Sequence, residues 1–291
     1  MKGLAILNAH KIYPSSKHFY ERMRDEFAKY GVELSYAQND EILACVNSES
    51  TISCKVKDND FILYIDKDPY VLAMLDKIGV RVFDKEEAIR LCDDKMLTYI
   101  TLSGNGIRMP KSVAGPLNYS NEVSETFITN LTAALSLPLV AKLNFGSMGS
   151  NVYLINTVDE LRNFEQVHRF DPRLYQEFIS ASRGKDYRLI VINGKFVAGM
   201  MRKNDNDFRS NIGAGGMGIS VEIPANYIEI AEKAAKILKL DYCGVDILDD
   251  NGSPVLCEVN SNAFLTGIEK TTGINVAKAY VEHILKELSY L

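Results

Sequence analysis

Two carboxylates and one amide gather in the last part of the sequence. The runs CGVDILDD and SPVLCEVN flank the pair Asn-Gly, which is typical of a two-residue hairpin turn. Glu258 and Asn260 are two residues apart and therefore point to one face, and Asp246 lies nearly opposite Glu258 if the connection holds an odd number of residues. Oxygen ligands without His or Cys predict a site for Mg²⁺ or Mn²⁺ bound with a phosphate. The alternative is a polar, solvated face of an edge strand.

A lysine followed by a glycine loop could bind phosphate. The strand LPLVAKL delivers Lys142 into NFGSMGS, where Gly146, Ser147 and Gly149 let backbone N–H groups approach an anion closely. Lys95, just after two aspartates, is a second candidate phosphate ligand. The pattern is neither a Walker motif nor a dinucleotide fingerprint. A glycine turn between two strands and a surface lysine on a helix are the alternatives.

Several cations lie around the preceding Asn-Gly hairpin. Asp186 and Arg188 share one face of the strand DYRLIVI, while RKNDNDFRSN adds Arg202 and Arg209. Together these cations could clamp a triphosphate and a negatively charged transition state, unless they form a solvated hairpin end. A two-residue turn puts Arg202 on the face opposite Asp186 and Arg188. A β-bulge, or a bend at Gly199, is needed to unite them.

Residues 1–92 alternate strand and helix signals. GLAILNA, FILYI and VRVF read as strands, Ser15 or Ser16 can cap the first helix, and Gly31 and Gly79 end the two helices. This β-α-β alternation predicts a parallel sheet with covering helices, a Rossmann-like domain of the α/β class.

The remaining chain has α+β character. We predict a small unit at 93–174, in which Thr157 and Glu160 form a capping-box pattern at a helix start. We predict a larger unit at 175–291, with two Asn-Gly hairpins, an alanine-rich helix and the closing helix INVAKAYVEHILKEL.

Composition excludes several classes of protein. The 291 residues carry 33 Lys and Arg against 38 Asp and Glu, a net charge of −5, so no general nucleic-acid-binding surface is expected. The longest apolar runs fall far short of the roughly 18 residues of a membrane span. Five scattered cysteines without a CxxC pair argue against a zinc site or disulfides. We therefore expect a cytoplasmic protein with no membrane partner, and a homo-oligomer is a common outcome for soluble proteins.

The order of these motifs resembles the ATP-grasp superfamily from about residue 94 onward. Lys95 and Lys142 with its glycine loop come first, followed by QEFI, DYR, DFRSN, GVDIL and EVN. The preceding domain looks like the pre-ATP-grasp domain. DFRSN, CGVDIL and especially GIEKTTGIN make the match closest to RimK-type carboxylate–amine ligases, such as alpha-L-glutamate ligases. The implied fold is a Rossmann-like domain followed by a two-lobed ATP-grasp fold.

The resemblance also implies roles for individual residues. Lys95 and Lys142 would contact the ATP phosphates beneath the glycine loop, and Glu177 and Phe178 would hold adenine and ribose. Arg188 and Arg202 are candidates for stabilising the acylphosphate and the tetrahedral oxyanion. The implied nucleotide-lining residues are Asp186, Arg209, Ser210 and Asn211. The implied magnesium ligands are Asp246, Glu258 and Asn260.

The implied reaction activates a carboxylate with ATP and Mg²⁺ and joins it to an amine, with an amino acid and a small-molecule or protein carboxylate as partners. Two departures from the RimK pattern concern the substrates. Gly213 and Ala214 stand where that pattern has His and Arg, and Ser261-Asn262-Ala263-Phe264 replaces the usual small-Ser-Pro-Gly. Glutamate as the added amino acid therefore does not follow. A kinase of a small hydroxyl substrate and a non-catalytic nucleotide-binding regulator are the alternatives.

Overall fold

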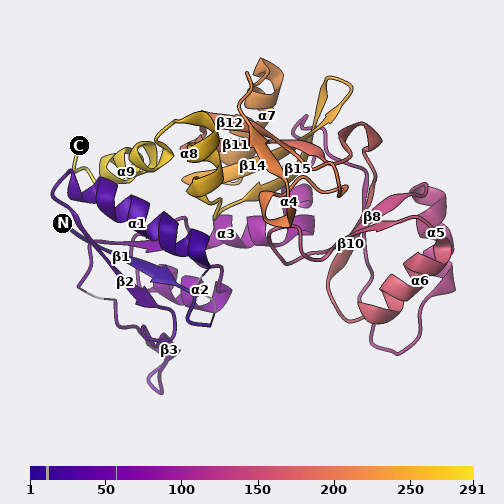
Figure 1. Ribbon diagram of the computed structural model, residues 1–291. Helices are drawn as coiled ribbons and strands as arrows, with labels where there is room; N and C mark the ends of the chain where they lie inside the picture. Colours follow the sequence, from indigo (N-terminus) through magenta and orange to yellow (C-terminus); the bar gives the residue numbers. More distant parts are fainter. Residues whose placement is uncertain (11–12, 57) are drawn as a thin grey trace.

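The chain folds into three parts in the computed structural model, which describes residues 1–10, 13–56 and 58–291 (Figure 1). The N-terminal domain and the small lobe that carries α5 and α6 lie at opposite ends of the molecule, with a five-stranded sheet between them. The mixed α/β architecture agrees with the fold class expected from the sequence.

The N-terminal domain contains a parallel sheet of order β2-β1-β5-β6, as the β-α-β alternation predicts. Short strands β3 (Cys45–Val46) and β4 (Ile52–Ser53) form an additional hairpin. The main elements are β1 (Lys2–Leu7), α1 (Pro14–Ala28), β2 (Glu33–Gln38), β5 (Phe61–Tyr64), α2 (Pro69–Lys77), β6 (Val82–Phe83) and α3 (Glu86–Asp93).

Helix α1 begins earlier than its serines suggest. The prediction that Ser15 or Ser16 caps it is wrong, because the helix starts at Pro14 with Tyr13 as N-cap. Proline suits this first position, since its fixed φ is helical and its missing N–H has no partner there. Both serines therefore lie inside the first turn. Gly31 and Gly79 adopt left-handed φ values of 71° and 76° just beyond the two helices that they were predicted to end.

The small lobe packs two helices against an antiparallel sheet of order β7-β10-β8-β9. Thr157 caps α6 by accepting from the Glu160 amide at 3.2 Å, as its sequence pattern predicts. The boundary expected between residues 174 and 175 falls within β10, all of which pairs in this sheet. The elements of this lobe are β7 (Ser112–Ala114), α5 (Glu125–Ala134), β8 (Leu139–Leu143), β9 (Val152–Ile155), α6 (Val158–Val167) and β10 (Arg173–Glu177). Helix α4 (Lys95–Leu102) precedes them in the sequence but packs against α3, α7 and β15.

The large lobe contains a sheet of order β13-β12-β11-β14-β15, built from the two predicted Asn-Gly hairpins. Helix α7 packs on one face, while α8 and α9 cover the apolar end of the other face. The elements are β11 (Lys185–Ile192), β12 (Lys195–Lys203), β13 (Met217–Ile219), α7 (Ala225–Ile237), β14 (Tyr242–Asp250), β15 (Ser253–Asn260), α8 (Leu265–Thr272) and α9 (Val276–Glu287).

Each hairpin carries a β-bulge that sets the direction of its polar side chains. In the first hairpin Val197 is the extra residue, so Asp186 pairs with Arg202 and both share one face. In the second, Cys257 is the extra residue, so Asp246 pairs with Glu258. Without these bulges a two-residue turn would place Arg202 and Glu258 on the opposite face. The sheet therefore carries the polar groups of both hairpins on one surface.

Candidate active site

A row of side chains crosses the open face of the five-stranded sheet. Arg188 pairs in register with Asp246, and Asp246 pairs with Glu258, so three neighbouring strands present one guanidinium followed by two carboxylates. The Arg188 guanidinium forks onto the Asp246 carboxylate, with Nη2 donating to Oδ2 at 2.7 Å. Such bidentate pairs fix geometry as well as charge. The row is therefore a rigid group of charges.

Arg202 extends this row on the neighbouring strand and is buried. Its Nε donates to Oδ1 of Asp186 at 2.7 Å, and its Nη2 lies 2.9 Å from Oδ2 of Asp246. Burial opposes the charge of Arg202, but the two carboxylates outweigh burial and raise its pKa. Burial likewise favours protonation of Asp246, yet Arg188 and Arg202 hold the pKa of that carboxyl below its usual value. Arg202 and Asp246 are therefore both charged at neutral pH.

Lys95 links the small lobe to this row. Asp94 caps α4 by accepting from the amides of Met96 and Leu97, which fixes Lys95 at the first helical position. The Lys95 ammonium donates to the Gly146 carbonyl at 2.9 Å and lies 3.4 Å from the Glu258 carboxylate. It thus stands between the start of the glycine loop and the predicted metal ligands.

Lys142 on β8 is a second buried ammonium on the same side of the cleft. Its Nζ lies 3.8 Å from the Cys257 thiol, the residue that forms the bulge of β15. Burial opposes its charge, but Cys257, Tyr99 and Glu258 together raise the pKa of Lys142 above its usual value. Lys142 therefore remains a cation in a desolvated place, where it would act strongly on a phosphate.

The glycine loop is fastened at its tip to the large lobe. The Arg209 guanidinium donates to the Gly149 carbonyl at 2.6 Å and is itself held by Asp207 at 2.7 Å. A Cβ on Gly149 would lie 2.7 Å from Oδ1 of Asn211, and this glycine has a φ of +73°. The close approach of the two segments therefore requires glycine at this position.

Replacing Gly149 by alanine should loosen this closure. The left-handed backbone costs about 1–2 kcal/mol for a residue with a Cβ, and the clash with Asn211 adds to it. We expect the KM for ATP to rise about 5- to 30-fold, measured by steady-state ADP release. Gly252→Ala is the matched control, because its φ is +87° but no atom lies within 4 Å of the added Cβ. An equal effect in both variants would contradict a role for the loop contact.

A narrow cleft of about 100 Å³ runs between the two lobes. Phe178 meets Phe208 edge to face with ring centroids 6.4 Å apart, and the Glu177 carboxylate accepts from the Lys111 amide at 2.8 Å. The segment of Glu177 and Phe178, which we call the hinge, is therefore held at both residues. Ser210 is buried at the same cleft. Pockets that enclose small ligands usually have about 300–1,000 Å³. The lobes must therefore separate further to admit a nucleotide.

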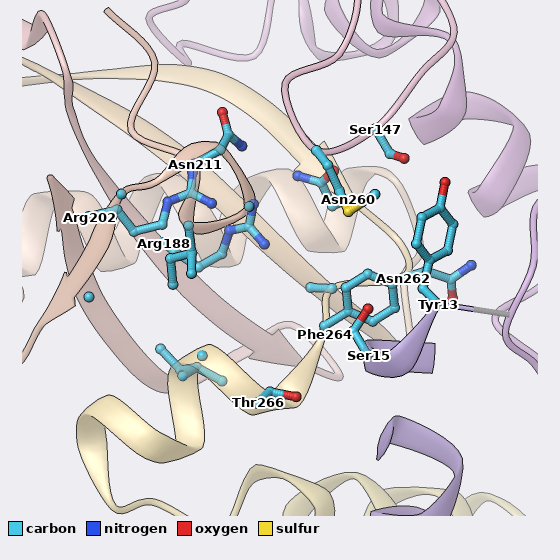
Figure 2. A pocket seen from close by; sticks show the side chains of 18 of the residues that line it. Tyr13, Ser15, Ser147, Arg188, Arg202, Asn211, Asn260, Asn262, Phe264 and Thr266 are labelled. Atoms are coloured by element: carbon cyan, nitrogen blue, oxygen red, sulfur yellow. The ribbon is translucent and has the colours of Figure 1, made fainter. Parts of the chain in front are cut away.

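A much wider cavity of about 990 Å³ adjoins the cleft between the large lobe and the N-terminal domain. The two spaces share Ser147, Arg202, Asn211 and Glu258 in their linings. Figure 2 shows Arg188 and Arg202 on one side of this cavity and the rings of Tyr13 and Phe264 on the other. A second substrate in the cavity would meet the end of the nucleotide at the shared residues.

The predicted magnesium ligands fit a divalent cation by their chemistry. Asp246 and Glu258 are paired across the strands, and Asn260 follows Glu258 by two residues on the same strand. The buried Nδ2 of Asn260 has no hydrogen-bond partner in the described chain; turning the amide by 180° would present its oxygen instead. Within residues 1–10, 13–56 and 58–291, His, Cys, Asp and Glu form no cluster of three or more suited to a metal. The amide is therefore needed to complete the set.

All site residues predicted from the sequence except Arg188 and Asn260 line the narrow cleft, and those two line the wide cavity. The cleft is also lined by Gln176, Lys185 and Cys257, which the sequence did not predict as site residues. Nor did the sequence predict the part of the cavity formed by the first turn of α1 and by Lys270 of α8. Gln176 lies within the QEFI motif and Lys270 within GIEKTTGIN, so those motifs held the available signal.

Comparison with known proteins gives a family match. Residues 92–284 match the RimK-like ATP-grasp domain. The chain is 36% identical over 219 residues to the "Probable alpha-L-glutamate ligase" of Maridesulfovibrio salexigens, covering 74% of this chain and 71% of that protein. It is 31% identical over 217 residues to human "Beta-citrylglutamate synthase B", covering 73% of this chain but only 55% of that protein.

Solved structures share the fold at low sequence identity. A D-alanine–D-alanine ligase from Bacillus anthracis, complexed with ATP, has a TM-score of 0.75 and 20% identity, with 99% of this chain and 97% of that chain covered. The ATP-grasp ligase PsnB, complexed with minimal precursor, Mg and ADP, has a TM-score of 0.68 and 14% identity, with 99% and 98% covered. In the described part of this chain, none of the helices is long and apolar enough to cross a membrane.

Proposed function

This chain belongs to the RimK-like ATP-grasp family and is an ATP-dependent carboxylate–amine ligase, and from that premise we propose how its residues divide the work. Lys95, Lys142 and the glycine loop bind the phosphates of ATP in the narrow cleft. The carboxylate substrate and the amine substrate enter through the wide cavity. The observation that carries this assignment is that the two spaces meet at Arg202 and Glu258.

The nucleotide base occupies the hinge end of the cleft. Glu177 and Phe178 lie there, held by Lys111 and Phe208. Asp186, Arg209, Ser210 and Asn211 line the phosphate end, where Arg209 holds the tip of the glycine loop. The buried position and raised pKa of Lys142 support its role as a permanent cation against the triphosphate.

Asp246, Glu258 and Asn260 would hold Mg²⁺, with Mn²⁺ as a substitute. ATP-grasp ligases use ATP with Mg²⁺, and the donor set of two carboxylates and an amide suits a hard cation. When bound, the ion supplies charge neutralisation between phosphoryl oxygens. The unpartnered buried amide group of Asn260 supports this assignment, because an unsatisfied buried polar group is costly without a ligand.

The reaction has two transfers. A carboxylate oxygen of the first substrate attacks the γ-phosphorus and ADP leaves, which gives an acylphosphate. The amine nitrogen of the second substrate then attacks the acyl carbon, phosphate leaves, and the nitrogen gives up a proton, which gives an amide. Arg188 and Arg202 face the place where these charges develop and are already oriented by Asp246 and Asp186.

Trapping the intermediate tests this function. The protein is incubated with ATP, Mg²⁺ and a panel of carboxylates in the presence of hydroxylamine, which converts an acylphosphate to a hydroxamate. We expect carboxylate-dependent ADP release with hydroxamate formation, and amide formation when an amino acid replaces hydroxylamine. ADP release with a stable phosphate ester instead would indicate a kinase. Tight ATP binding without either product would indicate a regulator.

The phosphate role of Lys142 makes a separate prediction. Lys142→Met keeps the buried volume but removes the charge, so we expect the KM for ATP to rise about 10- to 100-fold, the usual effect of losing a charged hydrogen bond. Thermal unfolding should change little, because methionine suits a buried position. Lys195→Met, at the exposed first residue of β12, is the matched control. An unchanged KM for ATP in Lys142→Met would contradict the assignment.

A homo-oligomer and a cytoplasmic location remain predictions from the sequence.

A further inference from the structure

The charged side chains that line the wide cavity are almost all satisfied within the protein. Arg188, Arg202 and Glu258 belong to the paired groups described above, Lys67 pairs with Asp93 at 2.8 Å, and Asp66 accepts from Asn8 and Asn39. The remaining one is Lys270 on α8, an exposed lysine for which the described residues provide no ion pair or hydrogen bond. Among the lining charges of the described residues, Lys270 is thus the one without a partner inside the protein.

The rim of the same cavity is apolar. Met148, Ile212 and Met217 are 43%, 41% and 59% exposed, and all three line the cavity although they come from three separate segments. Large apolar side chains gathered at an opening indicate an apolar ligand surface. The inner lining continues this character, because Met200 of β12 and Ile268 of α8 are buried in one apolar cluster.

We propose that the amine substrate of this ligase is an α-amino acid with an apolar side chain, whose unreacted carboxylate pairs with Lys270. The inference rests on the proposed function, in which the reacting carboxylate lies at the junction beside Arg202 and Glu258. The α-carboxylate of the amine substrate does not react and needs a cation elsewhere in the cavity. Lys270 provides that cation, and the apolar rim receives the side chain.

Glutamate fits this cavity poorly. Its second carboxylate would lie against Met148, Ile212 and Met217, whose side chains offer it neither a cation nor a hydrogen-bond donor. The segment beside Ile212 has Gly213 and Ala214 where the RimK pattern has His and Arg, so this chain lacks the cation that would balance the charge. The apolar rim therefore discriminates against a dicarboxylate.

Binding measurements test the substrate class independently of turnover. The full chain, saturated with a non-hydrolysable ATP analogue and Mg²⁺, is titrated by calorimetry with L-leucine, L-methionine, L-glutamate and L-leucinamide. We expect leucine or methionine to bind at least about 10-fold more tightly than glutamate, and leucinamide about 10- to 100-fold more weakly than leucine. Tighter binding of glutamate, or no binding of either apolar amino acid, would overturn the proposal.

A variant pair tests the role of Lys270. In Lys270→Met, leucine should lose the advantage that it holds over leucinamide, because the charge that reads the carboxylate is gone. Lys286→Met, an exposed lysine on α9 outside the cavity lining, should keep the wild-type ratio. If Lys270→Met keeps the wild-type ratio of leucine affinity to leucinamide affinity, the assignment is overturned.

Turnover separates this inference from the proposed function. If the panel supports amine-dependent ADP release but glutamate is preferred, the enzyme is a ligase and the substrate inference is wrong. If no amino acid supports ADP release, the proposed function is contradicted, while the order of affinities still decides which ligand the cavity prefers.

Discussion

Glu258→Gln should lower kcat by about 100- to 1,000-fold, the usual effect of removing one charged group that stabilises a phosphoryl transition state. The substitution keeps the shape of the side chain and removes only its charge. Glu258 is 25% exposed and its ion pair with Lys95 spans 3.4 Å, so little folding energy depends on it. The measurements are kcat as a function of Mg²⁺ concentration and the thermal unfolding midpoint.

The expected signature is a raised Mg²⁺ requirement at an unchanged unfolding midpoint. Glu222→Gln, at an exposed position before α7, is the control and should behave as wild type. Normal turnover of Glu258→Gln at ordinary Mg²⁺ concentrations would show that this carboxylate does not hold the metal.

Arg202→Met should affect both stability and activity. The side chain of Arg202 is 5% exposed and lies between the carboxylates of Asp186 and Asp246, so its removal leaves Asp186 without its guanidinium. Breaking a buried ion pair in this way costs about 3–5 kcal/mol of unfolding free energy. We expect urea denaturation to report that loss, and kcat to fall at least about 100-fold.

Asp186→Asn combined with Arg202→Met separates the two effects. The double variant no longer buries the unpaired Asp186 charge, so much of the stability should return while kcat stays low. Normal turnover in the double variant would mean that Arg202 only balances the carboxylates.

In the single variant Arg202→Met the pKa of Asp246 should rise. The loss of unfolding free energy relative to wild type should therefore shrink as the pH falls toward 3.8, the ordinary pKa of an aspartate.

Local sequence signals predicted the elements of this fold well. The two Asn-Gly pairs form the turns of β11–β12 and β14–β15, with Asn193 and Asn251 at positive φ as such turns require. The β-α-β alternation of residues 1–92 predicted a parallel sheet, because its strands are nearly continuous apolar runs. The start of α1 was mistaken, since a proline at the first position outweighed the capping tendency of Ser15 and Ser16.

The pairing of the charged residues could not be predicted from the sequence. It depends on the extra residues Val197 and Cys257, and neither has a side chain that distinguishes a bulge from regular strand. The wide cavity depends on contacts between distant segments, such as Arg22 of α1 with Glu269 of α8 at 3.0 Å. Local periodicity carries no information about such contacts.

Because of the bulges at Val197 and Cys257, the site depends on whether the number of residues between each turn and its site residue is odd or even. Deleting one residue of β12 between its turn and Arg202, or one residue of β15 between its turn and Glu258, would turn every later side chain of that strand to the opposite face of the sheet. Arg202 or Glu258 would then face α7. Deleting two would restore the facing but shift it along the strand. Natural variation in length should therefore be confined to the two turns and excluded from the strands that they join.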